Sequence, residues 1–308
     1  MKAIHIENLT KQYRDSVVLS GIDLSVEEGE FFALMGPNGS GKTTLVSIIS
    51  TVVAATEGTV EIYGRKPEQA KDLIAYVPQE NFSSPLLSGR ENLSYFAELL
   101  GYSGRTAKEL VRRTLEKVDL WEEAEKKVAK YSGGMKKRLE VATALFPGTK
   151  ILILDEPTTG LDPSARRKFF GLIDEIREEK TTVFLITHIG ADAELAGRVG
   201  MIDAGRIVAQ GAPDELKASS GLGDVISVET EIKNRRISDT LSGFSENRKV
   251  LETELGYRVY CSNADAATPD IVRSLDEIGC RATQMETIKP TLEDVFFHLT
   301  GKAVREVG

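Results

Sequence analysis

The first residues suited to chemistry lie in the segment FFALMGPNGSGKTTL, which has the spacing Gly36-x-x-x-x-Gly41-Lys42-Thr43 between a strand-like and a helix-like run. Glycines let backbone amides approach a polyphosphate, and the amino end of a helix favours bound negative charge. Lys42 is placed to reach the β and γ phosphates, and the Thr43 hydroxyl to ligate Mg²⁺. An ordinary glycine turn is the alternative, but every fixed position is filled and both flanks fit. The segment predicts a nucleotide site formed by Gly36, Pro37, Asn38, Gly39, Ser40, Gly41, Lys42, Thr43 and Thr44.

A second group of reactive side chains closes the segment ILILDEP, where an apolar run ends in Asp155 and Glu156. A buried strand that ends there places a carboxylate at the carboxyl edge of the sheet, where open α/β folds bind their ligands. Asp155 can hold Mg²⁺ through water, and Glu156 is a candidate general base for the water that attacks the γ phosphate. A polar loop start is the alternative, and the glycine loop upstream favours the nucleotide role.

A second glycine loop, YSGGMKKRL at residues 131–139, places a glycine pair between a hydroxyl and a basic run, directly before helix-like sequence. The elements that must position these loops alternate between strand and helix patterns over the first two thirds of the chain. Strands are expected at AIHIEN, VVLSGIDLSV, EFFALM, TVEIY, LIAYV, ILILD, TTVFLIT and RVGMID, and helices over residues 42–51, 107–118 and 165–176. Apolar strands with helices between them predict a parallel sheet covered on both faces. The charged run at residues 122–130 is most simply the solvated face of a helix.

The last third of the chain reads as a separate module that follows a flexible linker, ASSGLGD, at residues 218–224. Its pattern is strand, helix, strand, strand, helix and strand, which suits a small ferredoxin-like or related α+β fold. A final helix, PTLEDVFFHLTG, has an apolar stripe of Leu292, Val295, Phe296 and Leu299. No catalytic spacing occurs in this module, so packing or regulation is favoured over chemistry, and a passive appendage is the alternative.

Composition limits the classes of function. The chain has 308 residues, a net charge of −8 and a pI near 5.2, so no basic field favours nucleic acid as a partner. Cys261 and Cys280 lack a Cys-x-x-Cys spacing and are expected to be reduced thiols. The start is not a signal peptide, and no stretch approaches the roughly 18 apolar residues of a membrane span. Any membrane role is therefore expected to act through a partner.

Together these segments resemble the nucleotide-binding subunit of an ATP-binding-cassette (ABC) transporter. Kinases, small GTPases and helicases share the first glycine loop but not YSGGMKKRL, which is the signature loop of the family. The resemblance implies that two cassettes pack head to tail and that each signature loop caps the γ phosphate held by the partner. It assigns Ser132 and Gly134 to that phosphate, and Gly133 and Met135 to the turn. Tyr131 departs from the commoner leucine, which we interpret as a change in packing.

Further residues match the family in order along the chain. Tyr13 stands where an aromatic ring stacks on adenine, and Gln79, in YVPQE, matches the glutamine that touches Mg²⁺ and the attacking water. Asp162, in TTGLDP, matches the dimer-interface aspartate and is also placed to cap a helix. His188 matches the switch histidine that contacts the γ phosphate, whereas His5 matches nothing. The resemblance implies the catalytic residues Lys42, Gln79, Glu156 and His188, and the Mg²⁺ ligands Thr43, Gln79 and Asp155.

The implied fold is α/β: a P-loop NTPase cassette over residues 1–218, with a mixed sheet core, an antiparallel β subdomain and a helical subdomain. A small α+β domain follows at residues 224–308, with an accessory or regulatory role. The segments ENLSYFAELLGYSG and PTLEDVFFHLTG resemble cassettes of the daunorubicin/doxorubicin-exporter type, which pair with a separate membrane protein. The expected protein is therefore a homodimeric ATPase that uses ATP and Mg²⁺ to drive a transmembrane permease, with no nucleic-acid partner. It is expected in the cytoplasm, peripheral at the inner face of the membrane through that permease.

Two other classes of function remain open at this stage. One is a cassette ATPase without a transporter, in DNA repair or translation. Such proteins usually carry long coiled coils, zinc-binding cysteines or two cassettes, none of which is present in this sequence. The other is a purely regulatory nucleotide binder, which the presence of both Glu156 and His188 disfavours.

Overall fold

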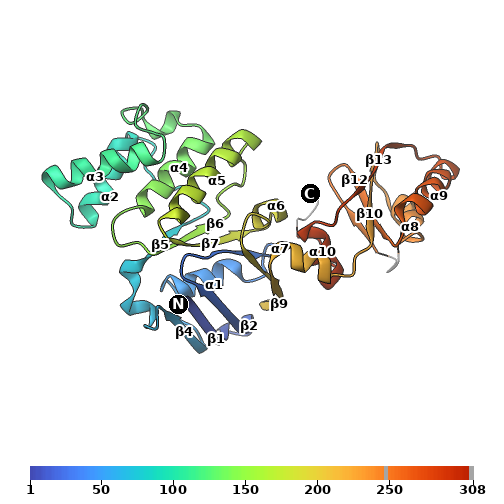
Figure 1. Cartoon of the computed structure of the whole chain (residues 1–308), viewed down its shortest axis with the longest axis horizontal. Coiled ribbons are helices and arrows are strands. Elements are labelled where there is room, and N and C mark those ends of the chain that lie inside the picture. Colours follow the sequence, from blue (N-terminus) through green and yellow to red (C-terminus); the bar gives the residue numbers. More distant parts are fainter. Residues whose placement is uncertain (246–248, 305–308) are drawn as a thin grey trace. The chain divides into compact units, whose positions relative to one another are not determined.

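The computed structural model describes residues 1–245 and 249–304. The whole chain is drawn in Figure 1. It divides into two compact units. The first contains Met1–Ala33 and Gly41–Thr187, and the second contains Leu34–Ser40 and His188–Gly308. These two units are defined by contacts between segments. The boundary predicted at residues 218–224 separates two parts with different expected roles, and it stays a prediction.

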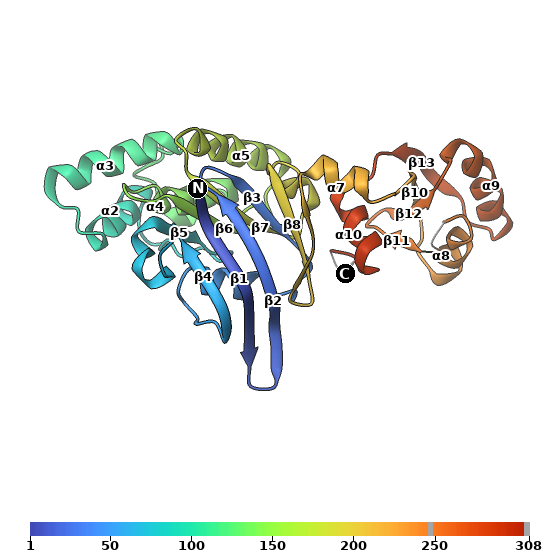
Figure 2. The same ribbon diagram turned by 60° about the horizontal axis from the view of Figure 1, so that its bottom comes forward.

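An antiparallel sheet in the first unit confirms the predicted β subdomain. Its strands are β1 (Lys2–Tyr13), β2 (Ser16–Glu27) and β4 (Glu57–Ile62), in the order β2-β1-β4. Figure 2 shows β1 and β2 as the long blue pair, with β4 beside β1. Ile4, Ile6 and Leu9 of β1 are buried, as expected for a sheet with one face against a core.

A parallel ladder in the same unit contains the strand that carries the predicted acidic residues. The strands β5 (Ile74–Val77), β6 (Ile151–Asp155) and β7 (Thr182–Thr187) pair in parallel in this order, and β3 (Phe31–Met35) follows β7. Every residue of β6 and β7 is buried, which explains why both read as continuous apolar runs. The helices α1 (Lys42–Ile49) and α5 (Pro163–Glu178) confirm two of the predicted helices.

The predicted helical subdomain is formed by three helices that contact one another: α2 (Gly89–Leu99), α3 (Gly104–Lys117) and α4 (Gly133–Ala144). They are teal to green in Figure 1. A capping box begins α2, since the Ser88 side chain accepts from the Glu91 amide and the Glu91 carboxylate accepts from the Ser88 amide. The helix α4 carries the signature loop at its amino end.

The helix expected over residues 122–130 is not formed. This segment consists of turns and a short 3₁₀ helix, Val128–Lys130. Its backbone is committed elsewhere, because the Val128 amide donates to the Leu87 carbonyl and the Ala129 amide to the Pro85 carbonyl. Tertiary hydrogen bonds to the residues before α2 replace the intrahelical ones. The charged pattern indicated exposure correctly and the secondary structure wrongly.

In the second unit, the predicted strand β8 (Arg198–Asp203) is followed by two elements that the sequence analysis did not identify. These are the strand β9 (Arg206–Gly211), antiparallel to β8, and the helix α7 (Pro213–Ser219). A short helix, α6 (Gly190–Ala193), lies just after His188. Within the described residues, no helix is long and apolar enough to cross a membrane.

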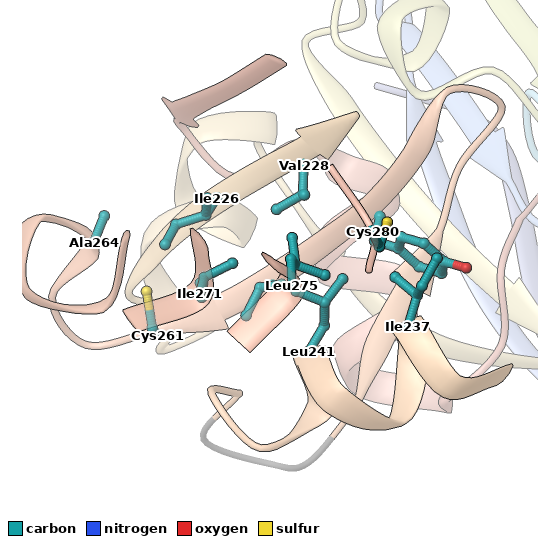
Figure 3. Packing of buried hydrophobic residues seen from close by; sticks show 11 residues of the cluster. Ile226, Val228, Ile237, Leu241, Cys261, Ala264, Ile271, Leu275 and Cys280 are labelled. Atoms are coloured by element: carbon teal, nitrogen blue, oxygen red, sulfur yellow. The ribbon is translucent and has the colours of Figure 1, made fainter. Parts of the chain in front are cut away.

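The last part of the second unit confirms the predicted order of strands and helices. Its elements are β10 (Asp224–Thr230), α8 (Arg235–Ser242), β11 (Val250–Glu252), β12 (Gly256–Cys261), α9 (Ala264–Glu277), β13 (Ala282–Ile288) and α10 (Leu292–Thr300). The sheet is antiparallel, in the order β11-β12-β10-β13, as in a ferredoxin-like fold. Figure 3 shows one apolar core, where Ile237 of α8 and Leu275 of α9 pack toward Val228 of β10. Cys261 and Cys280 are buried free thiols, as expected.

The helix α10 packs on residues of β10 and β12 that alternate with those of that core. Phe297 joins a cluster with Val225 and Tyr260, and the rings of Phe297 and Tyr260 stack with centroids 5.9 Å apart. The predicted stripe is wrong at Leu299, which is 48% exposed. Phe297 takes its place in the stripe. The face of α10 that packs on the sheet contains Asp294 and Phe297.

Asp294 is fully buried and is held by a small polar network. Its carboxylate accepts hydrogen bonds from Arg258 at 2.9 Å and from the Tyr260 hydroxyl at 2.8 Å. It also accepts from the Thr291 amide at 2.7 Å, which caps α10. Burial and the neighbouring carboxylate raise the pKa of Tyr260, so the hydroxyl stays protonated and donates. The network therefore fixes α10 to β12.

Removing this carboxylate is expected to loosen the module. Asp294→Ala should lower its stability by about 3 kcal/mol, since the largely buried Arg258 loses its counter-charge and the helix loses its cap. The measurement is hydrogen exchange of the β10 and β12 amides in the full chain, which should become faster. Asp270→Ala is the matched control, because it breaks only the exposed pair with Arg273. Equal protection in the two variants would contradict the assignment.

Candidate nucleotide site

The phosphate-loop sequence connects β3 to α1, as its pattern predicts. Gly41 is the N-cap of α1 and has φ of +105°, a conformation that side chains other than glycine rarely adopt. The helix begins at Lys42, so the backbone amides of its first turn point out of its amino end. Ser40 donates its amide to the Pro37 carbonyl at 3.2 Å, which closes the turn before the helix. The local backbone has the form that binds anions.

The structure brings Lys42 and Glu156 together in a buried pair. The Lys42 Nζ lies 3.9 Å from Glu156 Oε1, and both side chains are almost fully removed from water. Burial lowers the pKa of Lys42, whereas the charges of Glu156 and Asp155 act in the opposite direction. Lys42 therefore has a strong need for negative charge nearby, which a bound polyphosphate supplies.

Asp155 ends β6 inside the sheet edge, as predicted. Its Oδ2 accepts a hydrogen bond from the Tyr76 hydroxyl of the neighbouring strand at 3.0 Å. Burial raises the pKa of Asp155, and the hydrogen bond from Tyr76 partly opposes the shift. A desolvated carboxylate of this kind gains from a cation, so its chemistry fits Mg²⁺.

The number of protein groups that could bind a metal here also fits magnesium. The described residues contain no group of three or more His, Cys, Asp or Glu side chains that could hold a metal by themselves. Mg²⁺ in nucleotide sites is usually held by one or two protein groups together with phosphates and water. Asp155 and the Thr43 hydroxyl on the first turn of α1 are such groups. The site therefore suits a metal that arrives with its nucleotide.

Glu156 has an unusual backbone that aims its side chain. Its φ is +47°, in the left-handed region that non-glycine residues seldom occupy, and its amide donates to the Ile186 carbonyl at 2.9 Å. The Gln79 side-chain amide donates to Glu156 Oε2 at 3.2 Å. Local strain of this kind is typical of functional positions. Two predicted residues, Lys42 and Gln79, thus both contact the carboxylate of a third, Glu156.

Two further site residues were missed by the sequence analysis. Lys137 of α4 is buried and donates its ammonium to the Gln79 carbonyl at 2.6 Å. Burial lowers the pKa of Lys137, and Glu140 and Asp155 oppose the shift. Glu140, also buried, accepts from the Ser83 amide at 3.0 Å. The available signal was the spacing of Lys137, which lies three residues before Glu140 and four before the buried Val141, because positions three and four apart share one helix face.

The signature residues gather with Asp162 around one hollow. Ser132 is the N-cap of α4 and accepts from the Met135 amide at 3.3 Å, and Asp162 caps α5 as expected. Hydrogen bonds from the Ala165 and Ser164 amides lower the pKa of Asp162. The hollow has a volume of about 400 Å³ and is lined by Ser132, Gly134, Met135, Arg138, Asp162, Ser164, Ala165 and Lys168. Hydroxyl groups and the cations of Arg138 and Lys168 thus line this space together with the Asp162 carboxylate.

Tyr131, the departure from the family pattern, points away from this hollow into the subdomain. The ring is buried, and its hydroxyl donates to the Glu123 carbonyl at 2.8 Å. Burial raises the pKa of Tyr131, which keeps this donor protonated. Gly89, the first residue of α2, makes room for the hydroxyl, since a Cβ built there would lie 2.3 Å from its oxygen. The larger side chain is thus matched by a glycine on the neighbouring helix.

The remaining residues named from the sequence are Tyr13, His188 and His5. Tyr13 ends β1 and is 45% exposed, with the Lys11 ammonium 4.6 Å from the ring centroid. His188 directly follows β7 and belongs to the second unit. His5 lies on β1 and bonds to Glu7 at 2.8 Å, which agrees with a structural role.

Comparison with known proteins places these features in one family. A family profile for ABC transporters matches residues 19–159. The daunorubicin resistance ATP-binding protein DrrA3 of Streptomyces coeruleorubidus is 36% identical over 97% of this chain and 96% of its own. The linearmycin resistance ATP-binding protein LnrL of Bacillus subtilis is 30% identical over 98% and 100%, and the Nod factor export ATP-binding protein I of Burkholderia orbicola is 34% identical over 98% of each chain.

Solved structures agree with this over the first two thirds of the chain. The ATP-binding cassette MJ0796, a dimer bound to ADP and phosphate after hydrolysis, has a TM-score of 0.62 and 28% identity. It matches 68% of this chain and 98% of its own. CbiO1 of Clostridium perfringens, part of an ABC transporter complex, has a TM-score of 0.66 and 27% identity over 70% of this chain and 91% of its own. The predicted cassette fold is confirmed.

The fit between Tyr131 and Gly89 can be measured by a double-mutant cycle. Gly89→Ala should lower the free energy of unfolding by about 2 kcal/mol, because the added methyl overlaps the tyrosine hydroxyl. In a Tyr131→Phe background the same change should cost at least about 1 kcal/mol less. Urea unfolding followed by the fluorescence of Trp121, the only tryptophan, reports both values.

Gly171→Ala on α5 is the matched control for that cycle, since a methyl there meets no atom within 4 Å. It should not destabilise the chain. Strictly additive effects of Gly89→Ala and Tyr131→Phe would show that the two positions are not coupled.

Proposed function

Because the chain belongs to the ABC transporter family, as an ATP-binding subunit of the drug-exporter type, we propose that two copies hydrolyse MgATP head to tail beneath a separate membrane subunit. Members of this family hydrolyse ATP to power transport. The observation that carries the proposal is the buried cluster of Lys42, Asp155 and Glu156, with the exposed Gln79 bonded to Glu156. This set contains a phosphate-binding cation, a metal-binding carboxylate and a base beside the amide that orients water.

The proposed chemistry follows from what each residue can hold or accept. Lys42 and the loop amides bind the β and γ phosphates, whose charge would offset the cost of burying the Lys42 ammonium. Thr43, Gln79 and Asp155 would hold Mg²⁺, which would supply positive charge beside the phosphates. Glu156 accepts the proton of the attacking water, and Gln79 orients that water through its side-chain amide. His188 contacts the γ phosphate, and Tyr13 stacks on adenine.

The signature half of the site supports a dimer. Ser132, Gly133, Gly134 and Met135 begin α4 beside the hollow that Asp162 also lines. In the proposed dimer, this hollow caps the γ phosphate bound by the partner's loop, so each ATP lies between two chains. The solved cassette MJ0796 is described as dimeric, which supports the same arrangement here.

The helical subdomain supports a membrane partner. Leu86 precedes α2, Tyr95 and Leu99 lie on it, and Leu100 follows it, and all four are more than half exposed. Such apolar groups suit the cytoplasmic helices of a permease. The chain would then work in the cytoplasm, peripheral to the inner face of the membrane. The relatives are named for drug resistance or Nod factor export, which supports export and gives no support to DNA repair or translation.

We also assign roles to the two parts of the chain. Residues 1–218 would form the nucleotide-binding domain, and residues 224–308 an accessory domain that regulates it. The ferredoxin-like core supports this division, because its buried residues are apolar and serve packing.

Two substitutions separate binding from hydrolysis. Glu156→Gln should retain MgATP but lower the hydrolysis rate at least about 100-fold, since an amide cannot accept the proton of the water. The trapped complex should elute as a dimer at saturating MgATP on a sizing column. Lys42→Ala is the comparison variant, which should fail to bind MgATP and elute as a monomer. Normal turnover in either variant would overturn the site.

A mixing experiment tests whether the site is composite. Lys42→Ala and Ser132→Arg chains are each inactive alone, because each breaks both sites of its homodimer. A mixed dimer has one doubly broken site and one intact site, so mixing should restore part of the ATPase activity. If mixed dimers are shown to form and stay inactive, the signature does not act across the dimer.

A further inference from the structure

Two adjacent acidic residues at the start of α10 have different partners. Asp294 bonds to Arg258 and Tyr260 of β12, inside the C-terminal α+β module. Glu293 instead accepts a hydrogen bond from the Gly190 amide at 2.7 Å, and these residues are 103 positions apart in the chain. Gly190 is the first residue of α6 and lies two residues after His188. One turn of α10 therefore joins the module to the segment that carries the switch histidine.

The contact at Gly190 is close and specific. A Cβ built on Gly190 would lie 2.0 Å from Glu293 Oε2 and 2.5 Å from Oε1, so only glycine admits the carboxylate there. The N-cap of α6, Ile189, makes no side-chain cap hydrogen bond. Glu293 supplies that function from a distant part of the chain, as an acceptor for an amide at a helix amino end. A carboxylate in this position also suits the helix dipole.

A second contact joins the residues after α10 to the end of β8, which precedes a turn bonded to the phosphate loop. The Lys302 ammonium lies 2.8 Å from Asp203 Oδ2, at the end of β8. Two residues further on, the Gly205 amide donates to the Ser40 carbonyl at 3.0 Å. Glu293 in the first turn of α10 and Lys302 after its end thus contact segments that are close in the chain to predicted site residues.

We infer that Glu293 is a positioning residue, which fixes the loop of His188 through its hydrogen bond to Gly190 and so makes hydrolysis depend on the C-terminal module. The inference rests on the proposed role of His188 in hydrolysis. Glu293 itself does not touch the phosphates. Because the same helix turn is bonded to β12 through Asp294, a movement of the module changes the position of α6.

The test compares Glu293→Ala with Glu293→Gln in the full chain. The alanine variant lacks an acceptor, so the amides of Gly190–Ala193 should exchange with solvent about tenfold faster or more. Its kcat for MgATP should fall about fivefold or more, with KM within twofold, because the phosphate loop is intact. The glutamine variant retains an acceptor oxygen and should keep both values near those of the unaltered chain. Glu286→Ala, an exposed glutamate of β13, is the matched control and should change neither.

Two outcomes would overturn the inference. One is an unchanged exchange rate at Gly190–Ala193 in Glu293→Ala, and the other is faster exchange with an unchanged kcat. If Glu293→Ala does not fold, Glu293→Gln decides the matter. A reduced kcat in that variant, accompanied by an altered KM and by altered exchange throughout the chain, would also overturn the inference. The proposed function fails separately, if the unaltered chain neither binds nor hydrolyses MgATP. In that case the exchange rates alone decide whether Glu293 holds the loop.

Discussion

The buried charges at the end of β6 are the constraint on which the rest of the cassette depends. Lys42, Asp155 and Glu156 lie in a site where transfer from water costs several kcal/mol for each ion unless partners replace the solvent. The protein supplies some partners, including the Tyr76 hydroxyl and the Gln79 amide. Burial lowers the pKa of Lys42 and raises that of Asp155, so the removal of each charge from water is unfavourable. A bound polyphosphate and its metal would add charge of the opposite sign beside each group, and burial therefore supports the proposed affinity for MgATP.

Sequence patterns predicted the elements and residues whose signal is local. The glycine loop, the strand that ends in Asp155 and the βαββαβ order of the module each depend on residues within one segment, and each is present in the structure. Lys137 and Glu140 were missed because charged residues on a helix usually face water, and only the tertiary fold shows that they hold the backbone of the Gln79 loop. The helix expected over residues 122–130 is not formed, because backbone amides of this segment donate to carbonyls before α2, a tertiary pairing that the charged pattern does not show.

Tyr131 departs from the family pattern at one position in the sequence, but several segments of the fold accommodate its side chain. The side chain is large, yet it stays clear of the signature hollow because its ring extends toward α2, where Gly89 leaves room and Glu123 supplies an acceptor. The segment from Pro85 to Ser88 is bonded to the same turns through its carbonyl groups. Tyr131 therefore fastens the start of α2 to the signature loop. A force on α2 from a membrane partner would reach the signature through a packed contact and not through a flexible loop.

The proposed influence of the C-terminal α+β module on hydrolysis depends on geometry. An α-helix is stiff over one turn, so Glu293 and Asp294 cannot move independently of each other. In the interior of the module, Asp294 accepts hydrogen bonds from a guanidinium group, a tyrosine hydroxyl and a backbone amide. A change in the packing of the module would alter these hydrogen bonds. Glu293 transmits that position to an amide two residues after His188. A hydrogen bond to a charged acceptor is worth about 1.5–3 kcal/mol, enough to change the population of a loop about tenfold or more. Under the proposed role of Glu293, the module would modulate hydrolysis without itself touching the phosphates.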